Sequence, residues 1–268
     1  MIATDPLSIE AIRRRLRTRV VGRHLFLFGE VESTNTVLSR LAGSGATEGS
    51  VVLAESQRQG RGRLGQAWFS PSGVNLYASV LFRERLTPRA AAQFSFIAGL
   101  ALTDAIKELG LHPAIKWPND VLVDTKKVAG TLVECAIRGE LVDFLVLGVG
   151  VNLNVDPQSL HDALGEAAAA ATSLSAATGH EIDRNAFAAS YLNRLEDWAT
   201  CYRNNGAATV LAAWRDRDIL TGRRVMVRGA GAGFDGRVLG VNDEGRLVVQ
   251  DSLGSGRVVL TEEIRVLD

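Results

Sequence analysis

The sequence predicts an α+β protein with one large domain and a small C-terminal β-barrel. A β-α-β pattern begins near residue 25, and between residues 114 and 154 three apolar, β-rich runs alternate with short polar turns. Such short turns are typical of an antiparallel meander. Beyond residue 217, five short alternating segments separated by glycine-containing turns fit a barrel of SH3-like size. The length of 268 residues suits this division.

The elements of the first half follow from apolar spacing and from capping residues. Apolar residues three and four positions apart among arginines indicate a short amphipathic leader helix. Ser33 is a suitable N-cap, and Thr87-Pro88 favours the start of a long helix because the fixed φ of proline suits the first turn. In order, we expect a helix over 7–20, a strand over 25–31, a helix from Ser33 to about Ala42, strands over 50–55 and 75–82, and a helix from Thr87 to Gly110.

The second half is predicted to complete the sheet and to add helices and the barrel. Polar turns at 124–126 and 138–140 separate the strands of the meander, and helical spacing occurs over 184–203 and 207–217. The barrel strands are expected near Val225, Val238, Val248, Val259 and Val266, with turns at 229–233, 243–245 and 254–256. The expected parts are therefore a helical leader at 1–22, a large α+β domain at 23–217 and an SH3-like domain at 218–268.

Composition and charge exclude several classes of protein. Apolar residues make up 46% of the chain and charged residues 22%, with no run approaching the ~18 apolar residues of a membrane span. Lys plus Arg equals Asp plus Glu at 30 each, so the molecule has no long-range attraction for nucleic acid or for a membrane. Cys135 and Cys201 lie far apart, and no signal-peptide pattern opens the chain, which predicts a reducing, cytoplasmic location.

A Gly- and Arg-rich loop over Gln57–Gly65 is the first candidate site. Its glycines allow the backbone to approach a ligand, and Arg58, Arg61 and Arg63 are suited to clamping oxyanions. The loop matches neither the Walker phosphate loop nor the dinucleotide fingerprint. By composition alone, an anion-binding loop, a nucleic-acid-binding loop and a solvated surface loop stay equally open.

The segment Lys116-Trp117-Pro118-Asn119-Asp120 is a second candidate. Its proline ends an apolar strand and leaves an amide and a carboxylate in a fixed turn, where they could ligand a cation or position a substrate. An ordinary Asn-Asp turn between strands explains the pattern equally well. Further on, Lys127 opens a strand beside Gly130, which permits close approach of a ligand, although an exposed lysine at a hairpin edge is commoner.

Five short motifs occur in order along residues 25–155. They are Ser33-Thr34-Asn35, the loop Gly60-Arg61-Gly62-Arg63 with Trp68-Phe69-Ser70-Pro71, the segment 116–120, Lys127-Val128-Ala129-Gly130, and Gly148-Val149-Gly150-Val151-Asn152. Together they resemble the motifs of biotin protein ligases. The resemblance implies an α+β catalytic fold with a mixed sheet flanked by helices, related to lipoate ligases and class II aminoacyl-tRNA synthetases, followed by a small SH3-like domain.

The resemblance also implies a reaction in two steps. Biotin and MgATP would form biotinyl-5'-AMP and pyrophosphate, and the biotinyl group would then pass to one lysine of a biotin carboxyl carrier protein. In the first step a carboxylate approaches the α-phosphate, so cations must be fixed around two anions that repel each other. By position, Lys127 would bridge these two groups, and Asp120 would either hold Mg²⁺ or accept the proton of the carrier lysine.

The resemblance assigns the site residues to overlapping groups. The expected catalytic residues are Lys127, Arg63 and Asp120, with Asp120 also the candidate metal ligand. The expected biotin-binding residues are Ser33, Thr34, Asn35, Gln57, Gly60, Arg61, Gly62, Arg63, Trp68, Lys127 and Gly130. The expected ATP- or adenylate-binding residues are Arg61, Arg63, Trp68, Lys116, Asn119, Lys127 and Asn152. Within the biotin site, Trp68 would wall the valeryl chain.

Rival interpretations concern the substrate and the class of protein. The nearest alternative is a lipoate or octanoate ligase or transferase of the same fold. A transferase would need a nucleophilic cysteine, and only Cys135 is a candidate, although a buried structural cysteine is the expected role at that strand end. A nucleic-acid-binding module would use the Arg/Gly loop, but the zero net charge counts against it. Because about 32 residues precede Ser33, too few for a winged-helix domain, we expect no DNA binding. A monomer and a homodimer both stay open.

Overall fold

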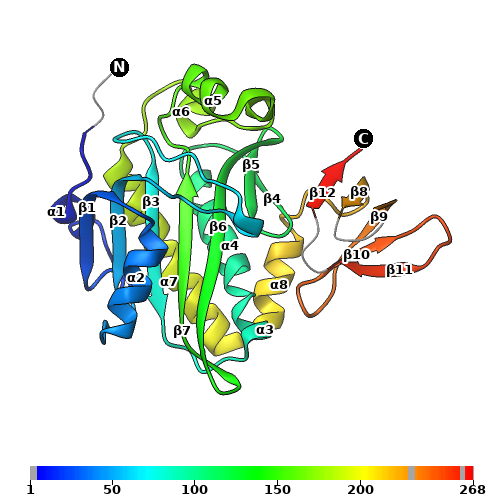
Figure 1. Cartoon of the computed structure of the whole chain (residues 1–268), viewed down its shortest axis with the longest axis horizontal. Coiled ribbons are helices and arrows are strands. Elements are labelled where there is room, and N and C mark those ends of the chain that lie inside the picture. The colour runs from blue at the N-terminus through cyan, green and yellow to red at the C-terminus, as the bar shows by residue number, and fades with distance from the viewer. Residues whose placement is uncertain (1–4, 229–232, 260–262, 268) are drawn as a thin grey trace.

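A seven-stranded mixed sheet forms the centre of the protein (Figure 1). The computed structural model describes residues 5–228, 233–259 and 263–267. The strand order is β1-β2-β3-β7-β6-β5-β4, in which β1 and β2 are parallel and every other pair is antiparallel. The strands are β1 Leu25–Val31, β2 Val51–Gln57, β3 Leu76–Phe82, β4 Pro113–Lys116, β5 Asp120–Val123, β6 Lys126–Arg138 and β7 Leu141–Val151. This confirms the predicted mixed sheet.

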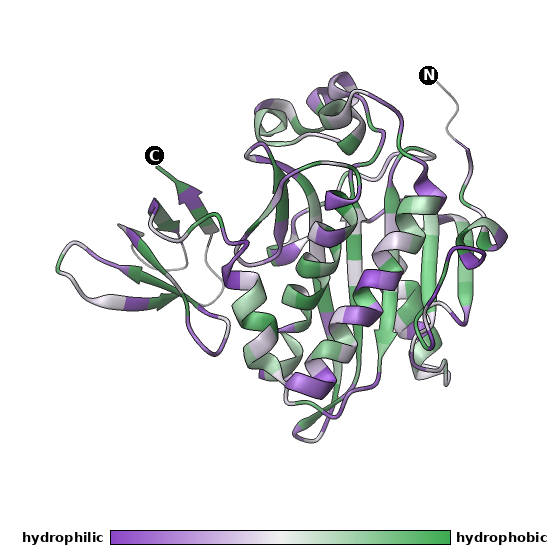
Figure 2. Cartoon of the chain, turned by 180° about the vertical axis from the view of Figure 1, so that it is seen from behind, coloured by the Kyte–Doolittle hydropathy of each residue, from purple (hydrophilic) through white to green (hydrophobic). Residues whose placement is uncertain are grey.

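Helices cover both faces of this sheet (Figures 1 and 2). Helix α2 (Thr34–Gly43) packs on one face, and α4 (Phe94–Lys107) and α7 (Arg184–Asn205) pack on the other. The remaining helices are α1 Ile9–Arg13, η1 Arg63–Gly65, α3 Pro88–Ala91, α5 Pro157–Leu164, η2 Gly165–Ala170, α6 Leu174–Thr178 and α8 Ala207–Arg215. In the described ranges, no helix combines the length and apolar character needed to cross a membrane.

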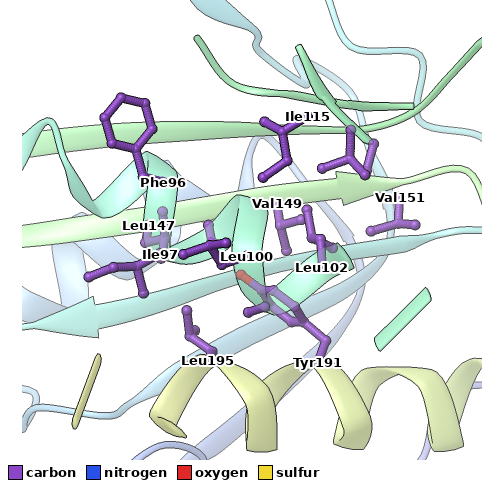
Figure 3. Close-up of a cluster of buried hydrophobic side chains, with 14 of the residues drawn as sticks. Phe96, Ile97, Leu100, Leu102, Ile115, Leu147, Val149, Val151, Tyr191 and Leu195 are labelled. Atoms are coloured by element: carbon purple, nitrogen blue, oxygen red, sulfur yellow. The ribbon is translucent and has the colours of Figure 1, made fainter. Parts of the chain in front are cut away.

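The two covered faces give two apolar clusters. The larger one joins the sheet to α4 and α7, and Figure 3 shows Leu147 and Val149 of β7 beside Leu100 of α4 and Tyr191 of α7. The smaller one lies under α2. Strand β3 is buried at all seven positions because it has helices on both sides. The burial pattern therefore explains why this strand reads as a nearly continuous apolar run.

A second, five-stranded antiparallel sheet follows α8. Its order is β11-β10-β9-β8-β12, and its strands are β8 Arg224–Arg228, β9 Phe234–Val241, β10 Leu247–Gln250, β11 Gly256–Val259 and β12 Glu263–Val266. Of the predicted turn at 229–233, residues 229–232 lie outside the described residues. The chain entering this sheet is tied to β4, because Ile115 N donates to Arg217 O at 2.8 Å and Ile219 N donates to Ile115 O at 3.0 Å.

The predicted leader helix over 7–20 is wrong in its length. The helix α1 covers only Ile9–Arg13, and the backbone that follows takes partners on α7 instead of forming helical hydrogen bonds. The carboxylate of Glu196 accepts hydrogen bonds from the backbone amides of residues 19–21. Asn193 similarly accepts from Arg17 N at 2.7 Å and donates to Arg15 O at 3.1 Å. Polar side chains of α7 therefore hold the segment after α1 in an irregular conformation. The spacing of apolar residues among the arginines does not show these distant partners.

The helix predicted from Thr87 to Gly110 is interrupted. Thr87 caps the short helix α3, with Pro88 in its first turn as expected, but α3 ends at Ala91 and α4 begins at Phe94. By contrast, the first predicted strand has the same bounds as β1.

Candidate active site

One pocket of about 220 Å³ lies above the sheet at the ends of β2, β4, β5 and β6. Most of the predicted site residues line it, although they come from four separate segments of the chain. Those that line it are Ser33, Thr34, Asn35, Gln57, Arg61, Gly62, Arg63, Trp68, Lys116, Asn119, Asp120, Lys127 and Gly130. Ile264 of the second sheet also reaches the pocket wall. A cavity of this size, lined by polar side chains from several segments, suits a small molecule.

Buried hydroxyl and amide groups form one end of the pocket. Ser33 is the N-cap residue of α2, but its side chain makes no capping hydrogen bond and so stays available toward the pocket. Gln57 Oε1 accepts from Thr34 N at 2.9 Å and lies 3.2 Å from Thr34 Oγ1. The Ser79 hydroxyl, fully buried in β3, lies 2.8 Å from Thr34 Oγ1 and 2.6 Å from Asn35 Oδ1. These mutual hydrogen bonds fix the polar groups in place.

The loop between β2 and β3 folds back over this polar end. Gln57 Nε2 donates to Ser70 Oγ at 3.1 Å, and Ser70 Oγ donates to Trp68 O at 3.0 Å. Gly60 is buried beside both residues, and a Cβ at this position would lie 2.6 Å from Ser70 Oγ. Gly60 therefore supports the loop from behind and, unlike the prediction, does not line the pocket.

Trp68 lies flat on a floor of backbone. A Cβ on Gly150 would lie 2.4 Å from Trp68 Nε1, and a Cβ on Gly130 would lie 3.1 Å from Trp68 Cζ3. Gly148 serves Asn35 in the same way, since a Cβ there would lie 2.2 Å from Asn35 Oδ1. The paired strands β6 and β7 thus leave out side chains where the pocket residues must approach.

Cationic side chains form the other end of the pocket. Lys127 Nζ lies 2.6 Å from Asp120 Oδ1 and 5.2 Å from the centroid of the Trp68 ring. Arg63 lies over Trp117, with its Cζ 6.0 Å from that ring. Burial lowers the pKa of the Arg63 guanidinium, and the nearby Asp120 carboxylate opposes this shift. An anion in the pocket would therefore meet charges that are already partly stripped of water.

A carboxylate links the two ends of the pocket. Glu134 Oε2 accepts from Asn35 Nδ2 at 2.7 Å, and Glu134 Oε1 pairs with Arg61 at 3.0 Å. Arg61 is thereby held against β6, and the Arg61–Ala67 bridge closes the base of its loop. Glu134 and Ser79 were not predicted as site residues. The only sequence signal for Ser79 is a small polar residue in an otherwise hydrophobic strand.

Some predicted residues have structural partners instead of open positions. Asn119 Nδ2 donates to Thr131 O at 2.6 Å, which joins the 117–119 turn to β6. Asn152 is buried outside the pocket and donates to Thr172 O at 3.0 Å. Asp120 belongs to no cluster of metal-binding side chains, since no group of three or more His, Cys, Asp or Glu side chains that could hold a metal occurs in the described ranges.

The expected burial of Cys135 is wrong. Cys135 is exposed on β6, since this part of the strand extends beyond β5 and has no strand on that side to cover it. Partial desolvation raises the pKa of its thiol. Both Cys135 and the pocket of the predicted site residues lie on β6, but Cys135 does not line that pocket. A thiol with these properties is a poor nucleophile for an acyl-enzyme.

The pocket has neutral hydrogen-bonding groups at one end and fixed cations at the other. This arrangement defines an α+β protein that binds a small molecule and stabilises negative charge on it. Comparison with known proteins agrees with this class. The sequence profile of the biotin/lipoate A/B protein ligase family matches residues 27–152. The chain is 34% identical over 232 residues to the biotin–(acetyl-CoA-carboxylase) ligase of Paracoccus denitrificans, covering 85% of this chain and 95% of that protein.

Further relatives agree along nearly the whole chain. The enzyme of the same name from Mycobacterium tuberculosis is 36% identical over 274 aligned positions, which cover 97% of each protein. Among solved structures, the biotin protein ligase from Aquifex aeolicus in complex with biotin and ATP has a TM-score of 0.76 at 26% identity, covering 91% of this chain and 100% of that one. The chain belongs to the biotin/lipoate A/B protein ligase family, in the biotin protein ligase branch that these relatives represent.

Proposed function

We propose that the protein is an ATP-dependent biotin protein ligase. It joins biotin and ATP to give biotinyl-5'-AMP and pyrophosphate, and then transfers the biotinyl group to a lysine of an acceptor protein. The observation that carries the proposal is the polarity of this pocket, in which buried neutral hydrogen-bonding groups lie at one end and Lys127 and Arg63 at the other. Biotin has the matching shape: a neutral ureido ring, an apolar chain and a terminal carboxylate.

The neutral end suits the ureido ring. Ser33 offers an uncommitted hydroxyl, and Thr34 and Gln57 already hold each other in a fixed orientation. A ligand that donates and accepts hydrogen bonds can be recognised here without reorganisation of the protein. Trp68 covers the chain of the ligand, because its ring lies on the glycine floor between this end and Lys127.

The cationic end suits the reaction itself. In the first step a biotin carboxylate oxygen attacks the α-phosphorus, the bond to the β-phosphate oxygen breaks, and pyrophosphate leaves. We assign Lys127 to the two reacting anions, and Arg63 and Arg61 to the phosphate groups, because fixed charges lower the repulsion between the anions before they react. In the second step the lysine amine of the acceptor attacks the acyl carbon, and AMP leaves.

Asp120 has a narrower role in this proposal. Its carboxylate holds the Lys127 ammonium at 2.6 Å, and it would have to leave Lys127 in order to bind a metal or to take a proton from the acceptor. We therefore assign Asp120 to the positioning of Lys127, and Mg²⁺ enters the reaction as part of the substrate MgATP. The acceptor is a biotin carboxyl carrier protein in the cytoplasm, and the domain limits near 22 and 217 are part of the same proposal.

Pyrophosphate exchange into ATP tests the proposed reaction. The protein should exchange labelled pyrophosphate only when biotin is present, and lipoate should not replace biotin. Mass spectrometry should then show a gain of one biotinyl group on a carrier domain with a single target lysine, and none on the same domain with that lysine changed to arginine. Exchange that depends on lipoate instead would assign the protein to lipoate ligation.

A further inference from the structure

Trp117 connects the candidate active site to the second sheet. It lies in the turn between β4 and β5, is only 3% exposed, and lines the pocket. Its indole Nε1 donates a hydrogen bond of 3.0 Å to the backbone carbonyl of Gly245, which is 128 residues further along the chain. Gly245 belongs to the turn between β9 and β10. This turn therefore acts directly on a residue of the pocket wall.

The turn that supplies the Gly245 carbonyl has a fixed shape. The side chain of Asn242 accepts from Glu244 N at 3.0 Å and from Arg246 N at 2.9 Å, and Gly245 N donates to Asn242 O at 2.9 Å. Gly245 has φ of +78°, and a Cβ there would lie 2.4 Å from Phe96 Cε2. Phe96 belongs to α4. The hydrogen bonds of the turn and the close packing against Phe96 of α4 therefore both fix the position of the Gly245 carbonyl.

The indole of Trp117 in turn supports a cation of the pocket. The Arg63 guanidinium lies over this ring at 6.0 Å, the outer limit of a cation–π contact. Asp120 is near enough to act on the charge of Arg63, but its carboxylate pairs with Lys127 at 2.6 Å, and no direct ion pair to Arg63 occurs among the described residues. A long arginine side chain without such a partner samples many rotamers unless packing restrains it. The Trp117 ring is the aromatic surface that provides this restraint.

We propose that Trp117 is a positioning residue for adenylate formation. Its hydrogen bond to the Gly245 carbonyl fixes the orientation of the indole, and the indole holds Arg63 toward the phosphates of ATP. The proposal rests on the proposed ligase function. At the neutral end of the pocket, Thr34 and Gln57 hydrogen-bond to each other, whereas the hydrogen bond of Trp117 goes to the turn. The hydrogen bond of Trp117 should therefore affect the use of ATP and leave the binding of biotin unchanged.

The first test removes the donor and keeps the aromatic ring. Trp117→Phe deletes the N–H group that Gly245 accepts but leaves a ring beneath Arg63. Trp198→Phe is the matched control, since the Trp198 indole also donates a hydrogen bond, at 2.7 Å to Asp104, but lies on α7 away from the pocket. Both variants should be compared at equal folded concentration, checked by thermal unfolding.

The second test moves the acceptor. Gly245→Ala forces the turn away from Phe96, whereas Gly254→Ala places the same residue at a similar φ of +80° in another turn of the second sheet, where nothing lies within 4 Å. The two variants carry the same backbone strain, so a difference between them reports the contact. Trp117→Phe keeps the inference testable if Gly245→Ala does not fold.

The readout is the split between substrates in biotin-dependent pyrophosphate exchange. Trp117→Phe and Gly245→Ala should raise the KM for ATP about three- to tenfold, the effect of losing one buried hydrogen bond. The KM for biotin and the rate of transfer from preformed biotinyl-5'-AMP should stay within about twofold, and both controls should match the unmodified protein.

Two results would overturn the inference in different ways. An unmodified protein without biotin-dependent exchange would remove the proposed function and this inference together. An active protein in which Trp117→Phe leaves the KM for ATP unchanged, or raises the KM for biotin equally, would overturn the inference alone and leave the ligase function in place.

Discussion

Replacing Lys127 by alanine should abolish most adenylate formation while the protein stays folded. Lys127 Nζ lies 5.2 Å from the centroid of the Trp68 ring in the pocket and pairs with Asp120 at 2.6 Å. A preorganised charge aimed at a developing anion is worth about 100- to 1,000-fold in rate. We therefore expect biotin-dependent pyrophosphate exchange to fall by about two to three orders of magnitude.

The effect of the same substitution on stability should be small. The Lys127 side chain is 34% exposed and that of Asp120 is 22% exposed, so the ion pair is partly solvated. Losing such a pair costs about 1 kcal/mol, which lowers the Tm by about 2–4 °C in a protein of this size. Activity and stability should thus separate clearly in one variant.

Lys126→Ala is the control for this experiment, because Lys126 is the neighbouring residue on β6 but is exposed and does not line the pocket. Exchange should be measured at saturating biotin and MgATP, with the Tm of each variant measured alongside. Near-normal exchange in a folded Lys127→Ala protein would refute the assignment of Lys127. A loss of the same size in Lys126→Ala would show that charge near the pocket, and not its position, is what matters.

Three other outcomes are expected. Glu196→Ala should lower the free energy of unfolding by about 2 kcal/mol, since three backbone amides lose their acceptor, while Asp197→Ala beside it changes stability little and neither alters the KM for biotin. Cys135→Ser should retain transfer to the carrier, because the thiol is exposed and its raised pKa keeps it protonated at neutral pH; loss of transfer in this variant would favour an acyl-enzyme. Trypsin should cut the ligand-free protein first within Arg58–Gly65, and biotin with MgATP should slow this cut while DNA does not, because the bound phosphate is enclosed by the loop; protection by DNA alone would instead support nucleic-acid binding.

Much of the fold was predictable because local signals and tertiary structure agree. A short apolar run predicts the strand over 25–31, and the structure places β1 there. The helix that follows also starts where predicted, after Ser33, although the Ser33 side chain makes no capping hydrogen bond. The leader over 7–20 was predicted too long because its backbone partners, Asn193 and Glu196, lie about 175 residues away in the sequence. Periodicity within a window cannot report such a partner.

The candidate site was predictable where motifs carry it and obscure where packing does. The loop arginines and Lys127 stand out in a sequence because charges cluster beside glycines. Ser79 and Glu134 do not, since each sits in a strand whose alternation explains it, and only the register of β3, β6 and β7 brings them beside Asn35. Cys135 was misjudged because the sequence does not show where β5 stops covering β6.

The glycines of β6 and β7 control the size of the pocket, and therefore which substrates can fit, without contributing side chains to it. Gly130, Gly148 and Gly150 line the pocket and set how deep Trp68 and Asn35 can lie, so the absence of side chains at these positions determines the depth of the cavity. A methyl group added at Gly148 would lie 2.2 Å from Asn35 Oδ1, so Asn35 would have to move and the shape of the pocket would change. To accept longer or bulkier acids, the enzyme would therefore have to be redesigned around these glycines as well as at the side chains that face the ligand.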